Sequence, residues 1–415
     1  MMTAYSFSRE VETYKHADVV IIGGGPAGTA AAISASRSGK KVVLLEKTAQ
    51  LGGMGTIANV SVFMPIGNVT GIYRELIAEM LAESLPAGHD ESIAPQYSPF
   101  MLRYYLNEKM KKENVDVYFH TEFVGTIQEG SKIKAVIVST REGLKAFEGE
   151  IFIDCTGDAR VAIDAGVPYT TGRDSDGLTQ PMTLMFTMQN TGKPVTPLLP
   201  EGCYEYKEVS DLPQGRRLYW EHNNDGSLLV NMSRVKANGA KIEDVNYAET
   251  EALRQVFSIA YYLQKTGFEN YALTHIAPQT GTRETNQIVG LYTLNEQDLT
   301  SGARFPDVVA QTNYEIDIHS PDAQKTTDER RIDGYDIPYR CMVPEAIDNL
   351  LIAGRSISAT HVAMSSMRVQ ATCYALGQAA GIAASLSIDH SSNLQNISID
   401  KLHQLLEDQG VKFKK

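Results

Sequence analysis

Residues 18–46 read DVVIIGGGPAGTAAAISASRSGKKVVLLE, and this stretch decides the fold. It opens with residues 19–22, an apolar and β-branched run that is typical of a buried parallel strand. A G-x-G-x-x-G turn follows directly, and the small side chains of residues 30–35 then favour a helix packed closely on a sheet. A second apolar strand is expected over residues 42–45, and it ends at Glu46. The stretch therefore predicts a strand, a glycine turn, a helix and a second strand that ends in an acid.

Each part of this unit has a mechanical role in binding a dinucleotide. Gly23 permits the tight turn, Gly25 lets a pyrophosphate approach the backbone, and Gly28 lets the helix and the strand touch. The free N–H groups at the helix N-terminus favour phosphate oxygens, and Glu46 can accept a hydrogen bond from a ribose hydroxyl. A lone G-x-G-x-x-G also occurs in ordinary glycine-rich turns. The complete unit, however, predicts that the chain binds an adenine dinucleotide.

Length and composition are those of a large globular protein. The 415 residues are enough for two domains, and a hydrophobic content of 43% supports a core for each. The net charge of −12 argues against nucleic acid or an anionic membrane as a partner. No apolar run approaches membrane-spanning length, and residues 1–17 lack the apolar core of a secretory signal. The four cysteines include no C-x-x-C pair, which argues against disulfide-exchange chemistry and favours a reducing, cytoplasmic setting.

The pattern along the chain predicts one discontinuous domain. Further parallel strands are expected at residues 115–119 and 151–154, and a small antiparallel meander is expected between them, at residues 122–128, 132–140 and 144–148. Near the carboxyl end, a strand that ends in glycine is expected within residues 349–355, and it precedes a helix over residues 366–386 that is rich in Ala and Gly. These segments have the same sequence pattern as the beginning of the chain, and they predict a first domain made of residues 1–160 and 335–415.

The middle of the chain has a different sequence pattern. Longer alternating segments at residues 181–189 and 227–235 are separated from one another by turn residues, and a long helix is expected at residues 247–265. No further G-x-G-x-x-G occurs there. Residues 161–334 are therefore predicted to form a second, mixed α+β domain inserted into the first.

Several motifs resemble a known group of flavoproteins. The GGGPAG turn, Gly52-Gly53, the Thr156-Gly157-Asp158 element and the terminal strand–glycine–helix are similar to those of the glutathione-reductase-like superfamily of FAD enzymes. Within it, the chain resembles the bacterial FAD-dependent oxidoreductases, and this likeness rests on PMT at 181–183, TRE at 282–284, YDIPYR at 335–340, AGRSISATH at 353–361 and RV at 368–369. The resemblance implies FAD as the cofactor. It also implies an α/β fold with a Rossmann-like FAD-binding domain, a parallel sheet and a β-meander, plus an inserted α+β substrate (cap) domain.

The resemblance also assigns cofactor-binding roles. It implies that backbone at Val124 meets the adenine and that the start of the last helix aims its N–H groups at the flavin pyrimidine. Many relatives carry an acid after the glycine of the last strand, whereas here Arg355 follows Gly354 and can pair with the pyrophosphate instead. The predicted cofactor-binding residues are Gly23, Gly25, Pro26, Ala27, Gly28, Glu46, Lys47, Gly53, Met54, Val124, Thr156, Gly157, Asp158, Gly354, Arg355, Met367, Arg368 and Val369.

Two residues are the first candidates for catalysis. His361 is the predicted proton-transferring group, because it lies between the last strand and the last helix, where the resemblance places the flavin ring. It falls near a substrate-binding histidine of the fumarate-reductase-like branch, although the arginine that follows there is Ser365 here. The alternative is an ordinary loop histidine bonded to backbone. Arg283 lies among turn residues, and it is expected either to reach a substrate oxygen or carboxylate or to form a salt bridge between domains.

Three further residues are weighed as catalytic candidates. Tyr339 and Arg340 precede the last strand and can line the same cleft; alternatively, Tyr339 packs in the core and Arg340 pairs with an acid. Arg368 is an unusual cation at a predicted helix N-terminus, which indicates an anionic ligand nearby. His275 and His319 are weaker candidates. The Asp and Glu residues show no metal-ligand spacing, so no metal is expected.

The first functional hypothesis is an FAD-dependent dehydrogenase or oxidase. It would transfer a hydride to flavin N5 from a small polar substrate, either a carbohydrate-like alcohol or a hydroxy acid. The alternatives are a flavin-dependent C=C reductase, a hydroxylase, or a non-catalytic flavin subunit that passes electrons to a partner protein. Because no second G-x-G-x-x-G is present, a dedicated NADPH domain is not expected. The expected partners are a small-molecule substrate, and further copies of the chain or an electron-acceptor protein.

Overall fold

A seven-stranded sheet forms the base of the fold in the computed structural model, which describes residues 5, 8–64, 67, 69–84, 96–221, 226–322 and 327–414. The strand order is β3-β2-β1-β6-β5-β4, with β17 beside β6. The parallel strands are β1 (Thr13–Ile22), β2 (Val42–Leu45), β3 (Asp116–Tyr118), β6 (Gly143–Asp154) and β17 (Leu350–Ile352). The antiparallel strands are β4 (Glu122–Glu129) and β5 (Lys132–Thr140). This parallel-rich, Rossmann-like sheet confirms the predicted fold class.

One strand differs from its prediction. The expected segments at residues 144–148 and 151–154 are a single strand, β6. Its first half pairs antiparallel with β5, through Ala135 opposite Glu148, and from Ala146 onward it pairs parallel with β1, as far as Ile22 opposite Asp154. Gly149 permits this continuity on the β1 side, because a Cβ there would lie 2.8 Å from the Val20 side chain. The glycine therefore marks a close approach between strands and does not mark a break.

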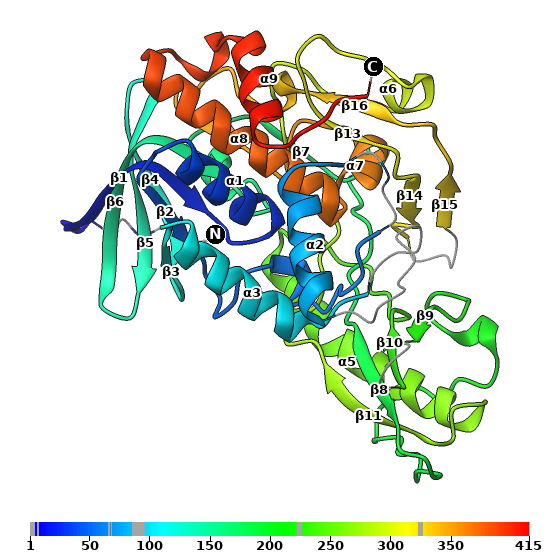
Figure 1. The fold of residues 1–415 in the computed structure, drawn as a ribbon. Coiled ribbons are helices and arrows are strands. Elements are labelled where there is room, and N and C mark those ends of the chain that lie inside the picture. Colours follow the sequence, from blue (N-terminus) through cyan, green and yellow to red (C-terminus); the bar gives the residue numbers. More distant parts are fainter. Residues whose placement is uncertain are drawn as a thin grey trace.

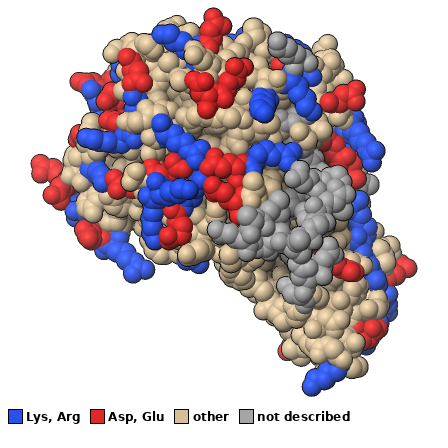
Figure 2. All heavy atoms as spheres, in the orientation of Figure 1, with Lys and Arg blue, Asp and Glu red and all other residues tan. Residues whose placement is uncertain are grey.

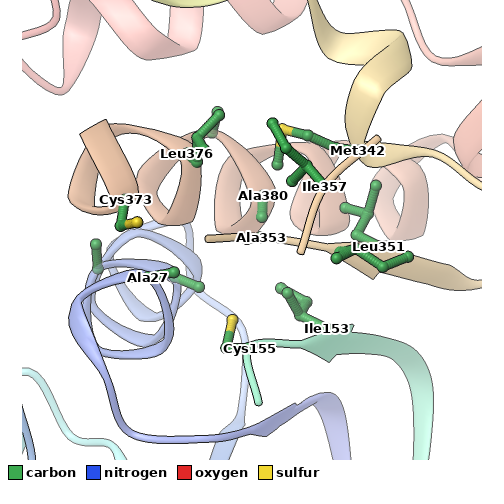
Figure 3. Packing of buried hydrophobic residues seen from close by; sticks show 14 of the residues in the cluster. Ala27, Ile153, Cys155, Met342, Leu351, Ala353, Ile357, Cys373, Leu376 and Ala380 are labelled. Atoms are coloured by element: carbon green, nitrogen blue, oxygen red, sulfur yellow. The ribbon is translucent and has the colours of Figure 1, made fainter. Parts of the chain in front are cut away.

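Two helices of small residues pack against each other on this sheet. They are α1 (Pro26–Arg37) and α8 (Gln370–His390). In Figure 3, Ala27 of α1 lies beneath Cys373 of α8, and Ile153 and Cys155 of β6 and its following loop lie below the same helix. By length and composition α8 is apolar enough to cross a membrane, but 94% of its most apolar window is buried inside the protein. That burial is typical of a core helix.

The crossing of α1 and α8 gives a stability prediction. Alanine normally stabilises a helix relative to glycine by about 0.5–1 kcal/mol. At Gly377, however, a Cβ would lie 2.0 Å from the backbone oxygen of Ala27, so the two helices would have to separate. We therefore expect Gly377→Ala to lower the free energy of unfolding by about 1–3 kcal/mol, as overpacking does.

Denaturant unfolding of purified protein measures this effect. The matched control is Gly125→Ala in β4, because the nearest atom to a Cβ there is an Asp164 oxygen at 3.7 Å, an ordinary contact. An unchanged or raised unfolding midpoint for Gly377→Ala would show that the helices are not in close contact.

A second sheet and a long helix form a separate core from the middle of the chain. The sheet has the order β11-β8-β10-β9 and is entirely antiparallel. Its strands are β8 (Phe186–Asn190), β9 (Tyr219–Glu221), β10 (Ser227–Val230) and β11 (Tyr271–Ile276), and α5 (Ile242–Lys265) packs on them through residues such as Ala252, Val256 and Ile259. These elements project as a limb at the lower right of Figure 1. The predicted domain boundaries at residues 160 and 335 remain a prediction.

The remaining elements connect the two sheets or cover the main body. The short strands are β7 (Tyr169–Thr171), β12 (Asn286–Ile288), β13 (Val308–Thr312), β14 (Ile316–His319), β15 (Thr327–Arg330) and β16 (Tyr335–Pro338), paired as β12-β7, β13-β16 and β14-β15. The helices are α2 (Ile72–Ser84), α3 (Pro99–Lys112), α4 (Arg160–Asp164), α6 (Glu296–Ser301), α7 (His361–Met367) and α9 (Ile399–Asp408). Acidic and basic side chains are interspersed over the upper part of the face in Figure 2.

The helix predicted over residues 366–386 is two helices in the structure. Helix α7 ends at Met367 with Arg368 as its C-cap, and α8 begins at Gln370 after Val369, whose ψ of 150° is extended. A cation is favourable at a helix C-terminus, so Arg368 is not the anomaly that a helix N-terminus would make it.

Candidate active site

The glycine turn after β1 builds one wall of a cavity of about 300 Å³. Gly23 has a φ of 103°, and a Cβ at Gly28 would lie 1.8 Å from the Gly23 oxygen, so both positions require glycine. Gly25 is different, because a Cβ there would have only one neighbour within 4 Å, the Gly53 Cα at 3.8 Å. Gly25 is also the N-cap of α1, and no side chain caps that helix. Its free N–H groups therefore face open space, which is what a pyrophosphate needs.

Glu46 stands at the end of β2 and is held in one orientation. Its side chain is buried, its Oε2 accepts a 2.7 Å hydrogen bond from the Gly24 N–H, and its Oε1 accepts one of 2.7 Å from the Thr48 N–H. A carboxylate has about four acceptor sites, so further sites remain for ribose hydroxyls. Glu46 and the neighbouring Lys47 both line the cavity. The acid at the end of the second strand thus lies where a dinucleotide ribose is expected.

The loop after β6 builds another part of the cavity wall, directly beside the glycine turn. The buried Asp154 accepts hydrogen bonds from the N–H groups of Thr156, Val161 and Ala162, which fixes this loop, although burial raises the pKa of Asp154. Asp158 receives a 2.7 Å ion pair from Arg355 Nη2. Gly157 has a φ of 77°, a conformation that favours glycine. Arg355 is therefore held by protein at the position where many relatives carry an acid.

The cavity brings together most of the predicted cofactor-binding residues. Its lining includes Gly23, Gly25, Pro26, Ala27, Glu46, Lys47, Gly53, Met54, Thr156, Gly157, Asp158, Gly354, Arg355 and Arg368. Four predicted residues do not line it. Gly28 packs helix on strand, Met367 is fully buried, Val369 lines a neighbouring cavity, and the Val124 side chain is exposed beside Phe123, which does line the cavity.

A second cavity of about 270 Å³ adjoins the first. The residues that line both cavities are Met54, Thr282, Arg355, Arg368 and Gln370. One of its walls is apolar and includes Val62, Met185 and Trp220, which pack together in a small cluster. Gln370, the first residue of α8, is fixed by a 2.7 Å hydrogen bond from its Nε2 to the Val60 oxygen. A ligand held in the first cavity thus meets the second at the start of α8.

Strand β14 supplies the polar groups of the second cavity. Its side chains alternate, with Ile316 and Ile318 in the core and Asp317 and His319 lining the cavity. His319 Nε2 lies 3.6 Å from Asp317 Oδ1. Tyr314 lies just before the strand, and its hydroxyl donates a 3.2 Å hydrogen bond to Asp317 Oδ2.

The surroundings of this pair set its charge. Burial, followed by the charges of Arg283 and Arg234, holds the pKa of His319 well below its usual value of 6.5, so the imidazole is neutral at pH 7. Burial alone would raise the pKa of Asp317, but the contact with His319 and the neighbouring arginine charges outweigh it and lower that pKa. The pair is therefore a carboxylate beside an uncharged imidazole.

Arginines occupy another part of the second cavity. Arg368 Nη2 pairs with Asp317 Oδ2 at 3.1 Å, and Arg216 Nη2 pairs with Glu329 Oε1 at 2.7 Å. Arg283 also lines the cavity, and its Nη1 donates to the Pro181 oxygen at 2.7 Å and to Thr183 Oγ1 at 2.6 Å. The anionic group beside Arg368 is thus a protein carboxylate, Asp317, and not the predicted ligand. Arg283, in contrast, lines a cavity, as its predicted role in binding a substrate requires.

The structure does not bring His361 to either cavity. Its Nδ1 lies 2.8 Å from Oε1 of Glu284, which is fully buried, and Glu284 Oε2 accepts a 2.8 Å hydrogen bond from the Gln180 N–H. A buried carboxylate requires such partners, so His361 serves the internal packing of this loop. This arrangement differs from both the predicted catalytic role and the alternative of a histidine bonded to backbone.

Tyr339 and Arg340 likewise lie outside both cavities. The buried Tyr339 hydroxyl donates a 3.0 Å hydrogen bond to the Leu394 oxygen, and Arg340 Nε pairs with Asp307 Oδ2 at 2.9 Å. These contacts are those of the alternative, in which Tyr339 packs in the core and Arg340 pairs with an acid.

Several residues that line the second cavity are ranked low or are not selected from the sequence, and most of them lie on or beside β14. His319 was only a weak candidate, and Asp317, Tyr314 and Trp220 were not singled out. The signal was present in the order Glu315-Ile316-Asp317-Ile318-His319, because alternation of apolar and ionisable residues is typical of a strand with one face in the core. That alternation predicts a shared face for Asp317 and His319, although it cannot identify the cavity.

The Rossmann-like sheet and the first cavity together are those of a flavoprotein that binds a dinucleotide. The chain belongs to the FAD dependent oxidoreductase family, whose model matches residues 18–406. It binds FAD, and the free α1 N-terminus at Gly25 and the oriented Glu46 fit the pyrophosphate and ribose of that cofactor.

Relatives agree with this class over limited parts of the chain. The chain is 30% identical over 148 residues to the soluble pyridine nucleotide transhydrogenase of Marinomonas sp. (strain MWYL1), which is 31% of this chain and 31% of that protein. It is 44% identical over 54 residues to the thioredoxin reductase of Ureaplasma parvum, or 13% of this chain and 18% of that one. A geranylgeranyl bacteriochlorophyll reductase-like structure from Thermoplasma acidophilum has a TM-score of 0.49 and 14% identity, covering 95% of this chain and 84% of that one. The chain thus spans about a third or less of these curated relatives.

Proposed function

We propose that the chain is an FAD-dependent dehydrogenase or oxidase that acts on a small polar substrate, a carbohydrate-like alcohol or a hydroxy acid, in the second cavity. The observation that carries this proposal is the Asp317–His319 pair, which projects from β14 into the cavity that adjoins the FAD site. A neutral imidazole can accept a proton, and a carboxylate beside it stabilises the imidazolium that results. This is the arrangement that removal of a hydroxyl proton requires.

The side chains around the cavity have distinct tasks in this reaction. FAD, when bound, supplies the acceptor for the hydride that leaves the substrate carbon. His319 takes the hydroxyl proton, so the substrate loses a hydride and a proton in all and becomes a carbonyl compound. Asp317 orients His319 and is itself held by Arg368 and Tyr314. The apolar wall at Val62, Met185 and Trp220 limits the access of water.

Anaerobic mixing of the FAD-loaded protein with candidate substrates tests this function. We expect hydroxy acids or sugar alcohols to bleach the flavin absorbance, because the second cavity offers a proton acceptor beside the FAD site. NADPH alone is expected to leave the colour unchanged, because the chain has no second G-x-G-x-x-G. Rapid bleaching by NADPH, with no response to any alcohol or hydroxy acid, would favour the reductase or hydroxylase alternatives instead.

A further inference from the structure

Two arginines near the second cavity pair with no carboxylate of the residues that the structure describes. Within the described part of the chain, Arg283 and Arg234 form no ion pair, whereas the other arginines of this cavity wall, Arg216, Arg355 and Arg368, each pair with an acid. Arg234 is buried, and its guanidinium donates only to neutral oxygens, among them Asn231 Oδ1 at 3.0 Å and Thr183 Oγ1 at 3.0 Å. Uncompensated buried charge is costly, so it requires a reason.

Thr183 couples the two guanidinium groups. Its Oγ1 accepts hydrogen bonds from Nη1 of both Arg283 and Arg234, and it donates its own proton to the Ser233 oxygen at 3.0 Å. Burial, followed by repulsion from Arg368, lowers the pKa of Arg283 to about 9, which still leaves it charged at pH 7. Two guanidinium groups are thus fixed on one hydroxyl at the edge of a cavity.

Arg283 has donors to spare for a ligand. Its Nη1 is used by Pro181 and Thr183, while its Nε and Nη2 donate to no oxygen of the described residues. An arginine with two neighbouring free donors matches the two oxygens of a carboxylate in a bidentate pair. Glu315 is the one acid of this wall that pairs with no arginine among the described residues, and burial, followed by the charge of Asp317, raises its pKa.

The other side chains of the second cavity indicate that the part of the ligand beyond its carboxylate is apolar. Val62, Met185 and Trp220 present an apolar surface across a cavity of about 270 Å³. We propose that Arg283, backed by Arg234 through Thr183, is a carboxylate-binding subsite, and that the substrate is a small organic acid with an apolar body. This inference rests on the proposed function for the site, and it selects the hydroxy acid over the neutral, carbohydrate-like alcohol.

Binding of a matched pair of ligands tests the subsite without any turnover. Phenylacetate and phenylacetamide have nearly the same shape, but only the acid is charged, and neither carries a hydroxyl to oxidise. Binding to the FAD-loaded protein is read from the flavin difference spectrum and from the fluorescence of Trp220, which is the one tryptophan of the chain and lies in the cavity wall. We expect the acid to bind at least roughly 30-fold more tightly than the amide, a difference of about 2 kcal/mol.

The variant Arg283→Gln is expected to remove this preference. Its acid and amide affinities should lie within about threefold of each other, because the charge that distinguishes the ligands is gone. The matched control is Arg216→Gln in the same cavity; Arg216 is already paired with Glu329, so the preference for the acid should persist. Equal binding of acid and amide by the unmodified protein, no binding of either, or an unchanged preference in Arg283→Gln would each overturn the subsite.

The outcome separates this inference from the proposed function. Equal binding of acid and amide by the unmodified protein, together with normal bleaching by an alcohol, would remove the carboxylate subsite and leave the oxidoreductase reaction. Retained acid binding with no bleaching by any hydroxy acid would remove the reaction and leave the subsite.

Discussion

Gly25→Asp is expected to abolish FAD binding while leaving the apo-protein folded. Gly25 has a φ of −73° and a ψ of −171°, which any residue adopts, and a Cβ there would meet only the Gly53 Cα, at 3.8 Å. Aspartate is also a favourable N-cap, so it should satisfy the free N–H groups of α1. The same carboxylate then occupies and repels the position of the pyrophosphate. We expect the FAD dissociation constant to rise roughly 1,000-fold, about 4 kcal/mol.

FAD titration and thermal unfolding of the apo-protein measure the two halves of this expectation. Gly25→Asn is the matched control, because asparagine has nearly the same size and also caps helices but carries no charge. It should weaken FAD binding less than aspartate does. If Gly25→Asp kept its full affinity for FAD, the turn would not be the pyrophosphate site. A collapse of apo-protein stability would instead show that Gly25 has a structural role like that of Gly28.

The second large effect is expected at His319. His319→Gln should lower kcat roughly 100- to 10,000-fold, the range that a positioned general base contributes. FAD affinity should change little, because His319 lines the second cavity and not the first. In the unmodified protein the base is active when neutral, and its pKa lies below 6.5. The value of kcat/KM should therefore be flat near neutral pH and fall only at more acidic pH, and this fall should be absent in His319→Gln.

His361→Gln is the matched comparison for that experiment. His361 contacts the buried Glu284 and lines neither cavity, so its loss should lower stability by about 1–3 kcal/mol and change kcat less than tenfold. A large loss of kcat in His361→Gln with almost none in His319→Gln would contradict this account. It would show that His361 is the catalytic histidine, as the sequence predicts.

The cofactor half of the site could be predicted from the sequence because its determinants are local. The turn from Gly23 to Gly28 and the acid at Glu46 lie within one strand–helix–strand unit, and close packing is enforced there by contacts such as that of Gly28 with the Gly23 oxygen. Short-range geometry of this kind is encoded by residue type and spacing. The two parallel strands of this unit, β1 and β2, could be predicted for the same reason.

The substrate half depends on contacts between distant segments. His361 occupies the expected loop, but its direction is set by Glu284, which lies 77 positions earlier in the chain. Arg368 is neutralised by Asp317, and Arg355 by Asp158, partners that no local pattern connects. The sequence shows which ionisable residues exist, whereas the tertiary pairing decides which of them remain to act on a ligand.

The most direct test of the central claim is a crystal structure of the FAD complex. The claim is that the FAD site of the first cavity opens, at the start of α8, onto a second cavity that presents His319. We predict the pyrophosphate against Gly25 and the flavin ring beside Met54 and Gln370, with His319 facing the ring across the second cavity. A flavin ring separated from His319 by intervening protein would contradict the account.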